Sequence, residues 1–178
     1  MVTTIFFLER IGTEELKCFY ITTDYRVVVL KNEEYNYEYL TNEGIKQLKI
    51  FGTPYCKIFG NWAFMVSNEK LKQIYSSIPD FCDILISHDA PDINNLGLIS
   101  TGRWSGENAG NTVLSEAIIE KKPKMVFCGH IHSGNHVLTK FNNIWMANVS
   151  YVDETYHPTN KILQIELNAI TKEVVSHN

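Results

Sequence analysis

The run Met125-Val126-Phe127-Cys128-Gly129-His130-Ile131-His132 carries the strongest structural signal in this sequence. Its four apolar residues are typical of a buried strand, and two histidines one residue apart follow them. Side chains two positions apart in an extended segment point to the same side, so His130 and His132 are expected to face one site. Gly129 is expected to allow a tight backbone turn in front of them. Such a pair is either a set of metal ligands or two polar residues at a strand end.

A second apolar segment of the same kind lies upstream. Residues 83–87 (Asp-Ile-Leu-Ile-Ser) form a predicted strand, and His88 follows at once. Between the two strands, residues 112–122 repeat apolar side chains at helical spacing. Strand, helical crossover and strand predict a parallel βαβ unit, and ligands bind beyond the carboxyl ends of such strands. If the strands are neighbours, His88, His130 and His132 converge on one metal ion.

The remaining pattern predicts a mixture of strands and one further helix. We expect strands at residues 18–21, 25–30 and 47–51, a loop at 31–43, a helix capped by Ser67 and ended by Pro79, and antiparallel strands at 137–141, 144–147 and 162–167, with a hairpin turn at Asn142-Asn143. Residues 3–17 show no clear pattern. This order of elements predicts an α/β or α+β layered fold.

Composition narrows the classes of function. At 178 residues, the chain is expected to form a single domain over residues 1–178. The net charge of −4 has no long run of either sign, which argues against a nucleic-acid-binding patch or a membrane-surface role. The four cysteines lack close pairing, and Cys82 and Cys128 lie in or beside apolar runs, so buried thiols and a reducing, cytoplasmic setting are expected.

The two segments that end in histidines resemble a known family. Asp83–Pro91 and Phe127–Gly134 are similar to the C-terminal half of the calcineurin-like metallophosphoesterases. Ile50–Pro54 with Gly60–Phe64, and Met146–Ser150, resemble a branch that has cyclic-nucleotide diesterase-like members. The resemblance implies a mixed-sheet αββα sandwich and a hydrolase that cleaves phosphate monoesters or diesters with a metal-activated water. The implied substrate is a small phosphate ester or a nucleotide.

The same resemblance implies a metal site with two ions. His88 and His130 would bind one ion and His132 the other, with Mn, Fe, Zn or Ni as the candidate metals. The family also uses an Asp-x-His, a Gly-Asp and a Gly-Asn-His on its N-terminal strands. The first two are absent from this sequence, and its one Gly-Asn-His, Gly134-Asn135-His136, follows the His-x-His instead of preceding it. We therefore expect that Gly-Asn-His to be a coincidence at a hairpin entrance.

These departures predict a partial metallophosphoesterase domain without its N-terminal strands. Its exposed sheet edge would favour a complementing chain or a second copy of this chain as partner. Three functions stay open: a phosphoesterase that is active when complete, a single-metal hydrolase with three histidine ligands, and a non-catalytic remnant that serves as a metal-binding or interaction module.

Several other polar and aromatic residues have two interpretations each. Asp89 and Asp92 are expected to be solvated loop residues and not ligands. Arg103 and Trp104 could hold a phosphate and a base, or be a surface arginine beside a packed tryptophan. Asn148 could support the site or occupy a turn. Trp62 and Phe64 are expected in the core or in a pocket wall.

Overall fold

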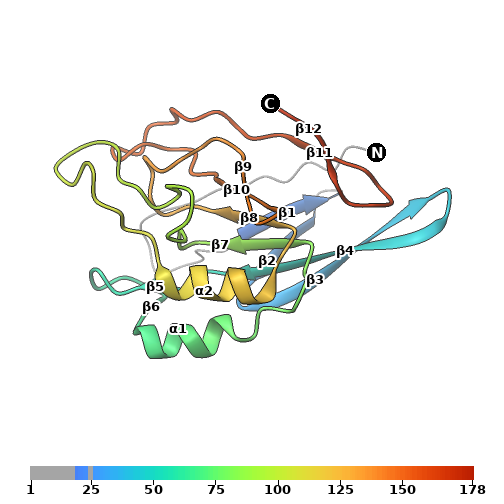
Figure 1. Cartoon of the computed structure of the whole chain (residues 1–178), viewed down its shortest axis with the longest axis horizontal. Helices are drawn as coiled ribbons and strands as arrows, with labels where there is room; N and C mark the ends of the chain where they lie inside the picture. Colours follow the sequence, from blue (N-terminus) through green and yellow to red (C-terminus); the bar gives the residue numbers. More distant parts are fainter. Residues whose placement is uncertain (1–18, 24–25) are drawn as a thin grey trace.

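A six-stranded mixed sheet organises the fold of this chain (Figure 1). The computed structural model describes residues 19–23 and 26–178, with side chains from residue 28 onward. The expectations for residues 3–17 and for Cys18 lie outside the described residues. The elements are β1 (Phe19–Thr23), β2 (Arg26–Leu30), β3 (Glu33–Thr41), β4 (Gly44–Thr53), β5 (Cys56–Lys57), β6 (Met65–Val66), α1 (Asn68–Tyr75), β7 (Ile84–Ser87), α2 (Thr112–Lys121), β8 (Met125–Cys128), β9 (Thr139–Phe141), β10 (Ile144–Asn148), β11 (Ile165–Leu167) and β12 (Val174–His177).

The central sheet has the order β3-β4-β7-β8-β10-β9. Strands β4, β7, β8 and β10 run parallel to one another, and β3 and β9 are antiparallel edge strands. The predicted βαβ unit is confirmed, because β7 and β8 pair in parallel with α2 between them. The carboxyl ends of four strands therefore meet at one edge of the sheet, which we call the carboxyl edge.

The sheet is covered on both faces. Both helices lie on one face (Figure 1), where Leu71 and Ile74 of α1 and Leu114 of α2 pack in one apolar cluster with Leu85 and Val126 of the sheet. On the other face, a second cluster joins sheet residues to β2 and to the strand pair β11–β12. The fold is thus α/β with a mixed sheet, as the sequence predicted.

The expected loop at residues 31–43 is wrong, because residues 33–41 form the edge strand β3. Tyr35, Tyr37 and Tyr39 alternate with exposed polar residues and pack against the second apolar cluster. An antiparallel edge strand needs only one apolar face, and tyrosine supplies it while the sequence stays polar overall. Strand β4 is also longer than expected, and β12 was not predicted at all.

The local turn and cap signals are confirmed. Ser67 caps α1 by accepting a hydrogen bond from the backbone N–H of Lys70. Asn142 and Asn143 both adopt positive φ angles, of 46° and 67°, between β9 and β10. This is the backbone that a two-residue type I′ hairpin turn requires, and asparagine tolerates it. However, β10 is antiparallel only to β9 and pairs in parallel with β8.

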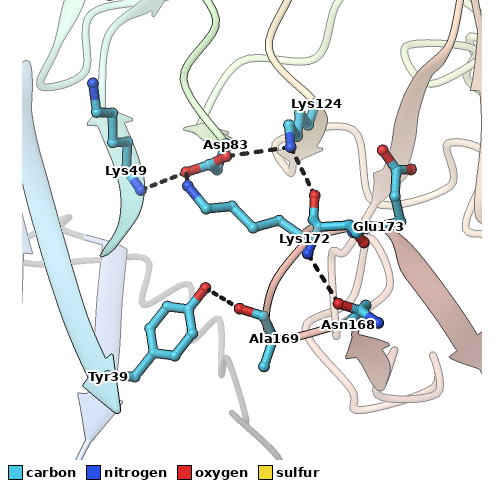
Figure 2. A network of polar contacts seen from close by, with 9 residues as sticks. Tyr39, Lys49, Asp83, Lys124, Asn168, Ala169, Lys172 and Glu173 are labelled. Atoms are coloured by element: carbon cyan, nitrogen blue, oxygen red, sulfur yellow. Dashed lines mark hydrogen bonds and ion pairs between the residues drawn. The ribbon is translucent and has the colours of Figure 1, made fainter. Parts of the chain in front are cut away.

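A buried charge network fastens the C-terminal strands to the amino-terminal end of β7 (Figure 2). The Asp83 carboxylate accepts a 2.6 Å contact from Lys172 Nζ and a 2.9 Å hydrogen bond from the Lys49 N–H. Lys124 Nζ lies 3.9 Å from the other Asp83 oxygen and donates to the carbonyl of Thr171. This network is at the opposite end of the strands from the carboxyl edge.

In the described part of the chain, none of the helices is both long and apolar enough to cross a membrane.

Candidate metal centre at the carboxyl edge

A row of polar side chains ends the four parallel strands. Thr53, Ser87, Cys128 and Asn148 are the last residues of β4, β7, β8 and β10, and the strand register places each beside the next. All four are buried. The residues that follow this row are therefore delivered to a common region above the sheet, as expected for an open α/β sheet.

Three potential metal ligands lie in that region: Cys56, His88 and His130. We call them the Cys–His–His cluster. One ligand atom from each residue lies within 4.8 Å of the other two. The two imidazole centroids are 4.7 Å apart, and their planes are tilted by 52°. Cys56 is buried and both histidines are half-buried, so the cluster is sheltered without being sealed.

The donor set of this cluster fits a transition metal. A thiolate and two imidazoles suit Zn²⁺, which takes tetrahedral N/S ligands with bond lengths of about 2.0 to 2.3 Å. Such bond lengths place neighbouring ligand atoms about 3.5 Å apart. The three atoms therefore need to approach by only about 1 Å, which side-chain rotation supplies. Three protein ligands also leave one tetrahedral position open.

Sequence reasoning predicted two members of the cluster and missed Cys56. The missing signal is positional: Cys56 follows β4, whose carboxyl end lies beside that of β7. A strand had been predicted at residues 47–51, but without a link to the βαβ unit. The neighbour of this strand in the sheet could not be inferred, because α1 lies between β4 and β7 along the chain.

His130 has an unusual backbone conformation. Its φ angle is +67°, in the left-handed region, whereas Gly129 is not among the glycines with positive φ. The tight turn therefore falls on the histidine itself. A non-glycine residue in this region costs about 1 kcal/mol and is often found at functional sites.

The left-handed turn also explains the position of His132. The i, i+2 rule applies to extended backbone, and a left-handed residue interrupts it. His132 is not part of the Cys–His–His cluster. Its Nδ1 lies 2.8 Å from the carbonyl oxygen of Asp153, and its ring contacts Tyr156 edge-on. A carbonyl only accepts, so Nδ1 is the donor in this hydrogen bond. The assignment of His132 to a separate ion stays a prediction.

Asn148 holds the loop that carries both histidines. Its Nδ2 donates to the carbonyls of Leu96, at 3.0 Å, and Ile131, at 2.7 Å, and its Oδ1 accepts from the Ser150 N–H at 2.9 Å. Gly134 gives it room, because a Cβ there would lie 2.5 Å from Asn148 Nδ2. Of the two interpretations of Asn148, the geometry favours support of the site.

The Gly-Asn-His at residues 134–136 makes loop contacts. Asn135 Nδ2 donates to the carbonyl of Asn94 at 3.0 Å. The two ring nitrogens of His136 lie 3.1 Å from the Asn148 carbonyl and 2.8 Å from the His132 carbonyl. These side chains brace the histidine loop, and the coincidental origin of the motif stays a prediction.

The expectation that Asp89 is a solvated loop residue is wrong. Asp89 is fully buried beneath the cluster, and its Oδ2 accepts hydrogen bonds from Asn111 Nδ2 at 2.6 Å and from the Lys57 N–H at 3.1 Å. Burial raises the pKa of this carboxyl to about 6, although those hydrogen bonds act in the opposite direction. The short loop turns Asp89 inward to anchor the cap of α2. Asp92, in contrast, is exposed as expected.

Buried oxygens without partners mark the same edge. Within the described part of the chain, Thr53 Oγ1, Ser87 Oγ and Asp89 Oδ1 have no hydrogen-bond partner. Native proteins rarely leave buried polar atoms unpaired, and the exceptions concentrate at functional sites. Ser87 and Asp89 flank His88, and Thr53 is the last residue of β4, three positions before Cys56.

The aromatic candidates lie at the surface. Arg103 stacks over Trp104 with its guanidinium carbon 5.0 Å from the ring, and Trp104 is half exposed, so the pair is a surface arginine on an exposed tryptophan. Trp62 is also half exposed, which excludes a core position and leaves the pocket-wall alternative as a prediction. Phe64 is half-buried and packs edge-on against Tyr55.

No family model and no curated protein matches this sequence. Among solved structures, the chain is similar to "GAP50 the anchor in the inner membrane complex of Plasmodium", with 11% sequence identity and a TM-score of 0.42. The similarity covers 84% of this chain, which spans 55% of that chain.

Proposed function

We propose that this chain binds one divalent transition-metal ion through Cys56, His88 and His130 and hydrolyses phosphate esters with it. The observation that carries the proposal is the convergence of these three ligand atoms within 4.8 Å of one another at the carboxyl edge. The left-handed backbone of His130 supports it, because a strained residue needs a compensating role.

The choice of one ion rests on the donors that the structure brings together. Within residues 28–178, the cluster is a single group of three ligands, and a thiolate favours Zn²⁺ over the harder Mn²⁺. A Zn²⁺ ion bound there would act as a Lewis acid on a phosphoryl oxygen and would acidify water. The chain itself orients the ligands: Asn148 fixes the loop of His130, and the end of β7 fixes His88.

The phosphate-ester part rests on the family resemblance. The two segments that carry it, Asp83–Pro91 and Phe127–Gly134, end at the same sheet edge and deliver His88 and His130 to one place. A calcineurin-like αββα sandwich is the finer version of the observed α/β fold and belongs to this proposal.

Metal binding is tested by titrating the purified chain with Zn²⁺ and Co²⁺. We expect one ion per chain, and a Co²⁺ complex that shows thiolate-to-metal absorption. Cys56→Ala should abolish that absorption, and His88→Ala and His130→Ala should each weaken Zn²⁺ binding by about 100-fold or more. Cys82→Ala and His177→Ala are matched controls, since both residues lie outside the cluster. Unchanged affinity in the three cluster variants would overturn the site.

Hydrolysis is tested on the same proteins with phosphate monoesters and diesters. We expect turnover that requires the metal and is lost in His130→Ala. Stoichiometric metal binding without turnover of any ester would overturn the hydrolase and leave the metal-binding module. Turnover that survives both chelation and His130→Ala would overturn hydrolysis by the metal at this cluster.

A further inference from the structure

An exposed aromatic pair lies beside the Cys–His–His cluster. The segment between β5 and β6 presents Phe59, 52% exposed, and Trp62, 53% exposed. Their rings meet edge-on with centroids 5.2 Å apart. We call these two residues the aromatic platform. Ile58, 60% exposed, extends the apolar surface by one more side chain.

The platform is in contact with a predicted metal ligand. The Phe59 ring centroid lies 4.9 Å from that of His130, and the two planes are tilted by 49°. His130 in turn lies 4.7 Å from His88. A group that is bound at the cluster and extends past His130 therefore reaches the platform next.

Exposed aromatic rings are costly to leave in water, and clustered ones mark binding surfaces. Large exposed apolar residues occur elsewhere, for example Leu40 and Ile45, which face each other on the β3–β4 hairpin. That pair lies at the amino-terminal end of β4, away from the Cys–His–His cluster. The platform differs because one of its rings, that of Phe59, contacts the potential metal ligand His130. Phe59 stays 52% exposed beside Trp62, so a third flat ring can pack against it.

We propose that the aromatic platform binds a flat aromatic ring of the substrate while the phosphate group of that substrate lies at the Cys–His–His cluster. This inference rests on the proposed function and names the substrate class: a phosphate ester that carries an aryl ring or a nucleobase. Stacking tolerates both kinds of ring, because each offers a π-face.

The test uses ligand pairs that differ by one ring. Phenyl phosphate is compared with methyl phosphate, and adenosine 5′-monophosphate with ribose 5-phosphate. Dissociation constants are measured by calorimetry on the Zn²⁺-loaded and on the metal-free chain. We expect the ligand with the ring to bind about tenfold more tightly in at least one pair. The pair with the larger preference identifies the source of the ring, aryl ester or nucleobase.

Variants then locate the ring. Phe59→Ala should remove most of the preference and leave the binding of methyl phosphate within about twofold, whereas Phe59→Tyr, which keeps the ring, should retain it. Phe81→Ala is the matched control: Phe81 is 69% exposed but precedes β7, at the opposite end of the sheet. Equal affinities within both pairs, no binding of any ligand, or a preference that survives Phe59→Ala would overturn the inference.

The two proposals fail separately. Hydrolysis that needs the metal but shows no ring preference overturns the platform and leaves the proposed function. A ring preference that depends on Phe59, in a protein that hydrolyses none of the esters, overturns the hydrolase and leaves the platform as a binding surface. Where hydrolysis occurs, Phe59→Ala should raise KM for phenyl phosphate about tenfold with a smaller change in kcat.

Discussion

At the residue scale, backbone conformation and burial decide the role of each polar side chain at the carboxyl edge. The sequence places His88 and His130 after buried strands, and the structure brings them together. It could not show that His130 is left-handed, nor that His132 turns away to Asp153 as a result. Asp89 was misjudged for a related reason, since a loop position says nothing about the direction of the side chain.

The burial of Asp89 predicts an unusual pH dependence of stability. The folded chain holds the Asp89 proton up to about pH 6, whereas an unfolded carboxyl releases it near its ordinary pKa of about 4. The stabilisation is therefore complete below about pH 4 and is lost as the pH rises through 6. The loss amounts to about 3 kcal/mol.

Asp89→Asn stays neutral and should escape that loss. In the metal-free chain, its free energy of unfolding relative to wild type should increase by about 3 kcal/mol between pH 4 and pH 8. Urea denaturation at several pH values measures this. A difference between the two proteins that is constant over the whole range would contradict the prediction.

At the element scale, periodic apolar segments were predictable and polar segments were not. Strands β7 and β8 and helix α2 follow from apolar runs and local end signals, and all are confirmed. Strand β3 was missed because its buried face is made of tyrosines. Cys56 was missed because the place of β4 in the sheet depends on long-range pairing. The sequence thus predicted the central βαβ unit but not which strands lie beside it in the sheet.

The start of α2 is predicted to matter more than the start of α1. Asn111 Oδ1 accepts from the N–H groups of Val113 and Leu114, and its Nδ2 donates to Asp89. Asn111→Ala removes the cap and one support of a buried carboxylate, so it should cost about 2 to 3 kcal/mol. Ser67→Ala removes one exposed cap bond and should cost about 1 kcal/mol or less.

Chemical denaturation of both capping variants at pH 7 gives the comparison. Because Asn111 also orients Asp89, which follows His88 directly, Asn111→Ala should weaken Zn²⁺ binding as well. Ser67→Ala should not. Equal losses of stability in the two variants would show that the contact with Asp89 contributes nothing.

At the scale of the whole molecule, the Asp83–Lys172 ion pair and the Cys–His–His cluster occupy opposite ends of the same strands. Asp83 and Lys172 are 89 positions apart, and no sequence pattern links them, so the pair could not be predicted. Figure 2 shows the side chain of Lys172 against Asp83, which directly precedes β7. Substitutions at the ion pair should therefore change the stability of the fold without changing metal binding at the cluster.

Lys172→Met is predicted to destabilise the chain and to leave metal affinity unchanged. The substitution leaves the buried Asp83 carboxylate with Lys124 Nζ, 3.9 Å away, as its remaining cationic partner. The free energy of unfolding should therefore fall by about 2 to 3 kcal/mol. Lys121→Met breaks a pair with the exposed Asp80 and should cost less than about 1 kcal/mol. Thermal unfolding and hydrogen exchange of residues 163–178 provide the measurement. Equal effects of the two substitutions would contradict it.

The three cluster residues follow three neighbouring strands that are far apart along the chain. An ion held between Cys56, His88 and His130 would therefore cross-link segments that separate widely when the protein unfolds. Closing two long loops restricts the unfolded chain much as disulfides do, and long loops lose more entropy than short ones. An ion bound there would in that case also stabilise the sheet. Removing the ion with a chelator would destabilise the whole fold and not only the loop that carries His130.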